Sequence, residues 1–79
     1  MKNTIKFTNE ETNEIIAAEV LGQQAFVNGK SPAPAMDSEV MKLVAKYSTS
    51  DFSKSHVIVA IFKQWAKGWH TANLVGDLQ

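Results

Sequence analysis

Two histidines are the side chains of this 79-residue chain best suited to proton transfer or metal binding. On one helix, His56 and His70 would lie almost four turns apart, or about 21 Å at 1.5 Å per residue. They are therefore too distant to share a metal ion within one chain, and no cysteine is present to provide a thiolate ligand. We expect no catalytic residues, no metal site and no cofactor.

The tripeptide Gly29-Lys30-Ser31 resembles the end of a phosphate-binding loop. Such a loop has the pattern Gly-x-x-x-x-Gly-Lys-Ser/Thr, and the earlier glycine is missing here. The Gly-x-Gly-x-x-Gly pattern of dinucleotide-binding proteins is also missing. The sequence therefore predicts a protein without enzymatic activity.

The charged residues balance, with eight basic and eight acidic side chains and a formal net charge of zero. All eight basic residues are lysines, so the bidentate guanidinium contacts that read bases and clamp phosphates are unavailable to this chain. A basic strip is nevertheless expected on the last helix, formed by His56, Lys63, Lys67 and His70. It is either a solvated face or a contact for phosphate or an acidic protein.

Local signals predict a first helix over residues 9–28. Thr8 and Glu11 have the spacing of a capping box, and Gly29 is a typical residue to follow a helix end. The connector 30–35 contains two prolines and is expected to be extended. Residues 1–7 are expected to form a flexible tail.

Two further helices are predicted over residues 38–47 and 53–75, the first capped by Asp37 or Ser38 and the second stopped by Gly76. The first of them has a one-sided apolar stripe with helical spacing, formed by Val40, Leu43, Val44 and Tyr47. The chain is therefore expected to be one small all-α domain of three helices, spanning residues 1–79.

The first and last helices are expected to pack together. Small residues form a ridge on the first helix, namely Ala18, Gly22, Ala25 and Gly29. We expect the rings of Trp65 and Trp69 to lie across this ridge, with Gly68 thinning the last helix at the same level. The apolar arc of the last helix comprises Val57, Ile58, Ile61, Phe62, Trp65, Gly68, Trp69, Ala72 and Val75.

A second apolar stripe on the first helix consists of Ile16, Val20 and Val27. A helix that is apolar on two sides needs two neighbours. The middle helix or a second copy of the chain could cover this stripe, which is our candidate protein interface.

Two blocks of sequence resemble the ribosome modulation factor family. Residues 22–31 contain Gly-x-x-Ala-x-x-x-Gly-Lys-Ser and residues 65–72 contain Trp-x-x-Gly-Trp-x-x-Ala, as also found in small phage and prophage proteins. The resemblance implies a helical hairpin and a translation regulator that contacts ribosomal RNA. It places Lys30, Lys63 and Lys67 near phosphates, with His70 as a further candidate.

We expect a small regulatory binding protein, associated with the ribosome if the resemblance extends to function. The alternatives are a phage-type module that docks on or inhibits a host protein, and a self-associating helical domain. Residues 57–62 are too apolar for the start of a DNA-recognition helix, so sequence-specific DNA binding is not expected. Without a signal peptide or a stretch of ~20 apolar residues, we expect a cytoplasmic protein with no membrane partner.

Overall fold

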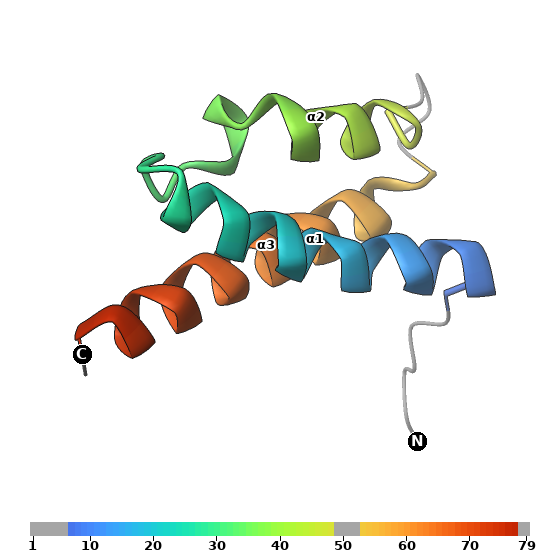
Figure 1. Ribbon diagram of the computed structural model, residues 1–79. Helices are drawn as coiled ribbons and strands as arrows, with labels where there is room; N and C mark the ends of the chain where they lie inside the picture. Colours follow the sequence, from blue (N-terminus) through green and yellow to red (C-terminus); the bar gives the residue numbers. More distant parts are fainter. Residues whose placement is uncertain (1–6, 49–52, 78–79) are drawn as a thin grey trace.

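The described part of the chain folds into three α-helices and a short 3-10 helix (Figure 1). The structure is a computed structural model that describes residues 7–48 and 53–77. In chain order the elements are α1 (Asn9–Val27), η1 (Pro34–Met36), α2 (Ser38–Ala45) and α3 (Ser55–Asp77). The described residues contain no β-strand, so the predicted all-α class is confirmed.

Both ends of α1 are fixed by the residues that predicted them. The hydroxyl of Thr8 accepts a hydrogen bond of 3.1 Å from the N–H of Glu11, and the N–H of Thr8 donates one of 2.9 Å to the Glu11 carboxylate. At the other end Gly29 adopts a φ of 78°, which favours glycine. The N–H of Lys30 then donates to the carbonyl of Ala25 at 2.8 Å, which satisfies one of the last carbonyls of the helix.

The connector between α1 and α2 is not extended throughout, because its second proline starts η1. Proline suits the first position of a helix, where its missing N–H is not needed. Asp37 follows η1 and caps α2, since its Oδ1 accepts a hydrogen bond of 3.2 Å from the N–H of Glu39. Of the two predicted caps, Asp37 is thus the one used.

The helix α3 begins and ends two residues later than predicted, so it includes Gly76, the residue expected to stop it. A glycine inside a helix costs about 1 kcal/mol relative to alanine, which a long helix tolerates. Glycine ends a helix by adopting a left-handed conformation, and within the described ranges only Gly29 does so. The presence of glycine at position 76 was therefore not enough to predict the end of the helix, because the end depends on the backbone conformation that the glycine adopts.

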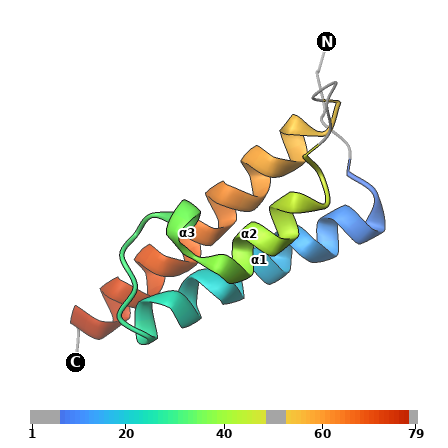
Figure 2. The same cartoon turned by 90° about the horizontal axis from the view of Figure 1, so that it is seen from above.

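The helices α1 and α3 lie side by side and run in the same direction (Figures 1 and 2). Near their starts, Lys54 Nζ lies 2.8 Å from a carboxylate oxygen of Glu11. Near their ends, the rings of Phe26 and Trp69 meet edge to face with centroids 5.1 Å apart. The helix α2 runs in the opposite direction and returns the chain from the end of α1 towards the start of α3 (Figure 1). Figure 2 shows it lying over the α1–α3 pair. The helical hairpin implied by the family resemblance is therefore wrong for this chain.

The predicted packing of α1 on α3 is confirmed, and glycines allow it. A Cβ placed on Gly22 would lie 2.0 Å from the carbonyl oxygen of Trp65, and one on Gly68 would lie 2.0 Å from that of Glu19. It is therefore backbone, and not the predicted tryptophan ring, that meets Gly22. A Cβ on Gly29 would meet nothing within 4 Å, so this residue ends α1 and takes no part in the close contact.

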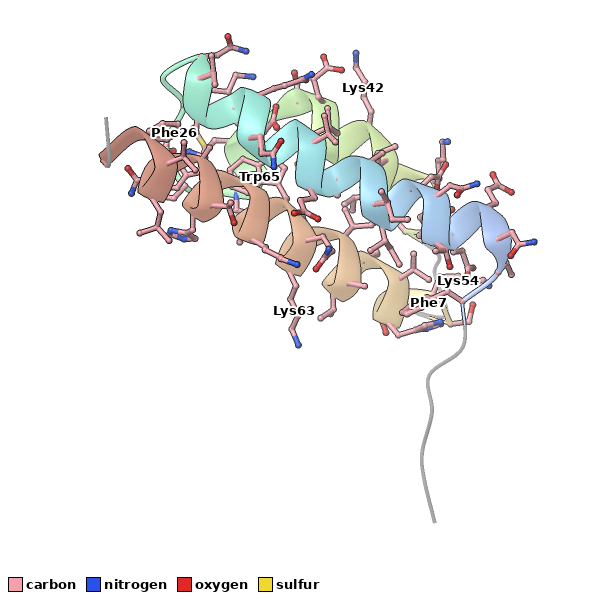
Figure 3. The ribbon with its side chains drawn as sticks, turned by 60° about the horizontal axis from the view of Figure 1, so that its bottom comes forward. Phe7, Phe26, Lys42, Lys54, Lys63 and Trp65 are labelled. Atoms are coloured by element: carbon pink, nitrogen blue, oxygen red, sulfur yellow. The ribbon has the colours of Figure 1, made fainter. Side chains whose placement is uncertain are left out.

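The core lies where all three helices meet. Trp65 is fully buried and appears between α1 and α3 in Figure 3. The buried hydrophobic residues are Ala18, Ala25, Val40, Val44, Tyr47, Val57, Ile61 and Trp65. The predicted stripe of the middle helix thus supplies three of them, and half-buried Leu43 packs against the cluster. Ala72 is half-buried and Val75 is half exposed, so the far end of the predicted α3 arc leaves the core.

The predicted flexible tail falls mostly on residues 1–6, which lie outside the described residues. Its last member, Phe7, is half-buried and packs against the core. Its ring stacks on that of His56 with centroids 5.6 Å apart and an interplanar angle of 24°. Phe7 therefore belongs to the folded domain, because α3 offers its ring an aromatic partner.

Candidate functional site

The two histidines occupy separate sites on α3. His56 is half-buried under Phe7, whereas His70 is exposed and lies at the edge of the Trp69 ring, with centroids 5.1 Å apart. Across residues 7–48 and 53–77, no three His, Cys, Asp or Glu side chains converge to hold a metal ion. The two histidines therefore do not form a joint site.

Most lysines of the described residues are paired with carboxylates. The ion pairs are Lys30–Asp37 at 3.1 Å, Lys42–Glu39 at 3.6 Å, Lys54–Glu11 at 2.8 Å and Lys46–Glu14. Lys63 and Lys67 make no ion pair with any residue in the described ranges, and both are exposed. Among the described residues, the lysines without an ion pair thus both lie on α3.

We name Lys63, Lys67 and His70 the basic stripe. They follow one another at spacings of four and three residues, which places them on one face of the helix. Figure 3 shows Lys63 directed away from α1 and α2. The structure therefore brings together three of the four predicted phosphate contacts and leaves their face open.

Lys30, the fourth predicted contact, lies elsewhere and is engaged in the fold. Its ammonium group donates to Oδ1 of Asp37, and its carbonyl accepts a hydrogen bond of 2.9 Å from the indole N–H of Trp69. The side chain of Lys30 is 40% exposed, but its charge is balanced by the buried carboxylate. It therefore fastens the connector to α3 and is not part of the basic stripe.

Asp37 is the residue whose importance was missed from the sequence. It is only 2% exposed, and its Oδ2 accepts a hydrogen bond of 2.7 Å from the indole N–H of Trp65. Burial raises the pKa of Asp37, but the hydrogen bonds from Trp65, Lys30 and the N–H of Glu39 outweigh it and hold the pKa below its ordinary value. A buried tryptophan N–H needs a hydrogen-bond acceptor. This requirement was the feature from which an acceptor beside Trp65 could have been predicted.

Two further carboxylates of α1 tie it to its neighbours. The Lys54 ammonium and the N–H of Thr8 hold the pKa of Glu11 below its ordinary value. Glu14 accepts from the ammonium of Lys46 and the hydroxyl of Tyr47, and these hydrogen bonds lower its pKa as well. Both carboxylates are thus occupied within the fold and are not offered to a partner.

The predicted second stripe of α1 is exposed, so α2 does not cover it. The exposed fractions are 56% for Ile16, 47% for Val20 and 77% for Val27. An open hollow on the same side of α1 is lined by Val20, Gln23, Gln24, Val27 and Asn28. We name Ile16, Val20 and Val27 together with this hollow the apolar surface of α1.

Of the remaining residues predicted to pack α1 on α3, Trp69 meets Phe26 of α1. Ala25 is buried, and Trp69 and Ala72 are half-buried.

None of the described helices combines the length and the apolar character that a membrane crossing requires. Comparisons with protein-family models, curated proteins and solved structures give no match.

Proposed function

We propose that this chain is a non-enzymatic regulator in the cytoplasm that binds ribosomal RNA through the basic stripe. One observation carries the proposal. Four lysines of the described ranges are neutralised by carboxylates, whereas Lys63 and Lys67 face solvent together without an acidic partner there. Two such ammonium groups one turn apart can contact neighbouring phosphates of one strand.

The resemblance to ribosome modulation factor supports this choice of partner. Its two sequence blocks supply the residues at the contact of α1 and α3, above all Gly22, Trp65 and Gly68. That contact sets the rotation of α3, so it also sets the direction in which the basic stripe points. The shared packing motif thus contributes to function by presenting Lys67, at one of its variable positions, and Lys63, one turn before it.

Binding through this stripe has a predictable dependence on salt. Each neutralised phosphate changes the logarithm of the affinity by about 0.7 to 0.9 per tenfold change in salt. Two lysines therefore predict an affinity that falls roughly tenfold between 50 and 200 mM salt.

The experiment is co-sedimentation of the full chain with ribosomes from its own host at both salt concentrations. We expect binding at low salt, about tenfold weaker at high salt, and a much flatter salt dependence for Lys63→Gln with Lys67→Gln. The control is Lys42→Glu, which changes the net charge by the same amount on α2, where Figure 3 shows Lys42 pointing away from α3. This control should bind like the wild type.

Two results would contradict the proposal. In one, the protein stays in the supernatant at low salt. In the other, the double glutamine variant and the Lys42→Glu variant bind equally well, which would remove any role for the basic stripe.

The apolar surface of α1 favours a second candidate function, in which the chain docks on another protein. The exposure of Ile16, Val20 and Val27 is the observation behind it. This function predicts binding that is nearly independent of salt and is lost on Val27→Asp, with the lysines of the basic stripe having no effect. Pull-down experiments with Val27→Asp, and with Lys63→Gln combined with Lys67→Gln, distinguish this protein-docking function from RNA binding.

A further inference from the structure

We infer that the apolar surface of α1 is the interface of a symmetric homodimer, in which Ile16 of each copy fills the hollow on α1 of the other. This inference concerns a different face from the basic stripe and does not depend on RNA binding. It rests on the charge, the shape and the spacing of side chains on α1.

The outward face of α1 carries no charge around Val20. Three of its four glutamates turn towards the other helices, because Glu11 pairs with Lys54, Glu14 pairs with Lys46, and Glu19 accepts a hydrogen bond of 3.4 Å from Gln64. Glu10 is exposed in the first turn of α1, ten residues or about 15 Å along the helix from Val20. The residues exposed on the outward face are Asn9, Asn13, Ile16, Ala17, Val20, Gln24 and Val27.

An uncharged face suits pairing with its own copy. In a two-fold interface the residue at the axis meets itself, so a charge there would meet a like charge. The apolar surface of α1 has valine and isoleucine at its centre and only amides beside them. Two copies can therefore approach through this surface without electrostatic repulsion, which the basic stripe would not allow.

The hollow on α1 is open and is lined by residues of that helix and its C-cap alone. Four of its lining residues, Val20, Gln23, Gln24 and Val27, stand at positions i, i+3, i+4 and i+7. Helices that pack in pairs receive a side chain of the neighbour in a hole made by four such residues. An aliphatic side chain is the suitable occupant, because valines line two corners of the hole.

Ile16 lies at the right distance to be that occupant. It precedes Val20 by one turn on the same face and is more than half exposed. The centre of the hollow falls between Gln23 and Gln24, so Ile16 and the hollow are nearly equidistant from Val20 along the helix. An antiparallel pair with Val20 close to the two-fold axis therefore places each Ile16 over the hollow of the other copy.

Sedimentation equilibrium of the full chain tests the dimer over about 10 to 500 µM, the range suited to a small interface. We expect the mass of the wild type to rise from that of the 8.7 kDa monomer towards twice that value. Val20→Glu should remain monomeric throughout, because it places two carboxylates at the axis. The control is Val59→Glu on α3. Val59 has a similar exposed fraction, 51%, and its replacement should leave the association of the two copies unchanged.

A cross-linking experiment tests the geometry even if Val20→Glu folds poorly. The chain has no cysteine, so a single substitution gives an unambiguous product. Under oxidation, Val20→Cys should form a disulfide dimer, since the two Cβ atoms meet at the axis, and Val59→Cys should not.

Three results would overturn the inference. The first is a wild type that stays monomeric over the whole concentration range. This result would overturn the inference even if Val20 were found to bind a different protein. The second is equal dissociation by Val20→Glu and Val59→Glu. The third is faster cross-linking of Val59→Cys than of Val20→Cys. None of them affects ribosome binding through Lys63 and Lys67, so failure of either proposal leaves the other testable.

Discussion

The indole N–H of Trp65 donates a hydrogen bond of 2.7 Å to Oδ2 of Asp37, and both side chains are buried. The other oxygen of the same carboxylate accepts from the ammonium of Lys30 at 3.1 Å and from the N–H of Glu39 at 3.2 Å. One carboxylate thus joins α3 to the start of α2 and to the residues that follow α1. This junction holds α2 over the pair formed by α1 and α3.

Replacing Asp37 by alanine should destabilise the fold strongly. The change leaves the buried Trp65 N–H without its acceptor, which costs about 1 to 3 kcal/mol, and it also removes the partner of Lys30. We expect the free energy of unfolding, measured in urea, to fall by about 2 kcal/mol or more. Met36→Ala is the control, because this neighbouring side chain is exposed. Equal stability of the two variants would show that the hydrogen bond does not hold α2.

Alanine at Gly22 or Gly68 should force α1 and α3 apart. The new Cβ would lie 2.0 Å from a backbone oxygen of the facing helix, and backbone cannot rotate away as a side chain can. We expect each change to cost about 3 kcal/mol or more, at the upper end of overpacking effects. Thermal unfolding followed by circular dichroism measures it. Gly29→Asn should cost much less, because asparagine tolerates a positive φ and the space there is open.

The stability of the fold should decrease in acid. The pKa values of Glu11, Glu14 and Asp37 are below their ordinary values of 4.5 for glutamate and 3.8 for aspartate. Between the folded and the ordinary pKa the unfolded chain binds more protons, so the free energy of unfolding rises with pH there. The stabilisation is complete above the ordinary values and is lost as pH falls through the folded ones.

Urea unfolding at pH 7, 4.5 and 3 measures this dependence. The midpoint should be lowest at pH 3 for the wild type and should change less for Glu14→Gln, which removes one of the three carboxylates. A wild-type midpoint that is unchanged at pH 3 would mean that these carboxylates are not ionised partners in the folded protein.

Tyr47 should resist ionisation in the folded state. Its hydroxyl donates to Glu14, and this hydrogen bond to a carboxylate raises the pKa of the phenol well above its ordinary value of 10.0. Tyr47 is the single tyrosine of the chain, so absorbance at 295 nm reports on it alone against two tryptophans. We expect no tyrosinate at pH 10.5 in the wild type and substantial ionisation in Glu14→Gln. Ionisation of the wild type at its ordinary pKa would contradict the contact.

Much of the secondary structure could be predicted because its signals are local. Thr8 and Glu11 are three residues apart, and Gly29 acts on the helix that it follows, so neither depends on the rest of the fold. The exposure of Lys63 and Lys67 followed equally from the apolar pattern on the opposite side of their helix. The prediction of Gly76 as a stop was wrong because a glycine ends a helix only when its backbone turns left-handed.

The sequence by itself determined that α1 and α3 pack together, since small residues on both are needed for a close approach. Only the tertiary structure decided that they run parallel, with α2 as the returning segment. The same arrangement decided that Lys30 faces Asp37, that Phe7 stacks on His56 and that the apolar surface of α1 stays uncovered. These contacts join residues from different elements, and a pattern within one helix carries no information about the side chain that a neighbouring helix places against it.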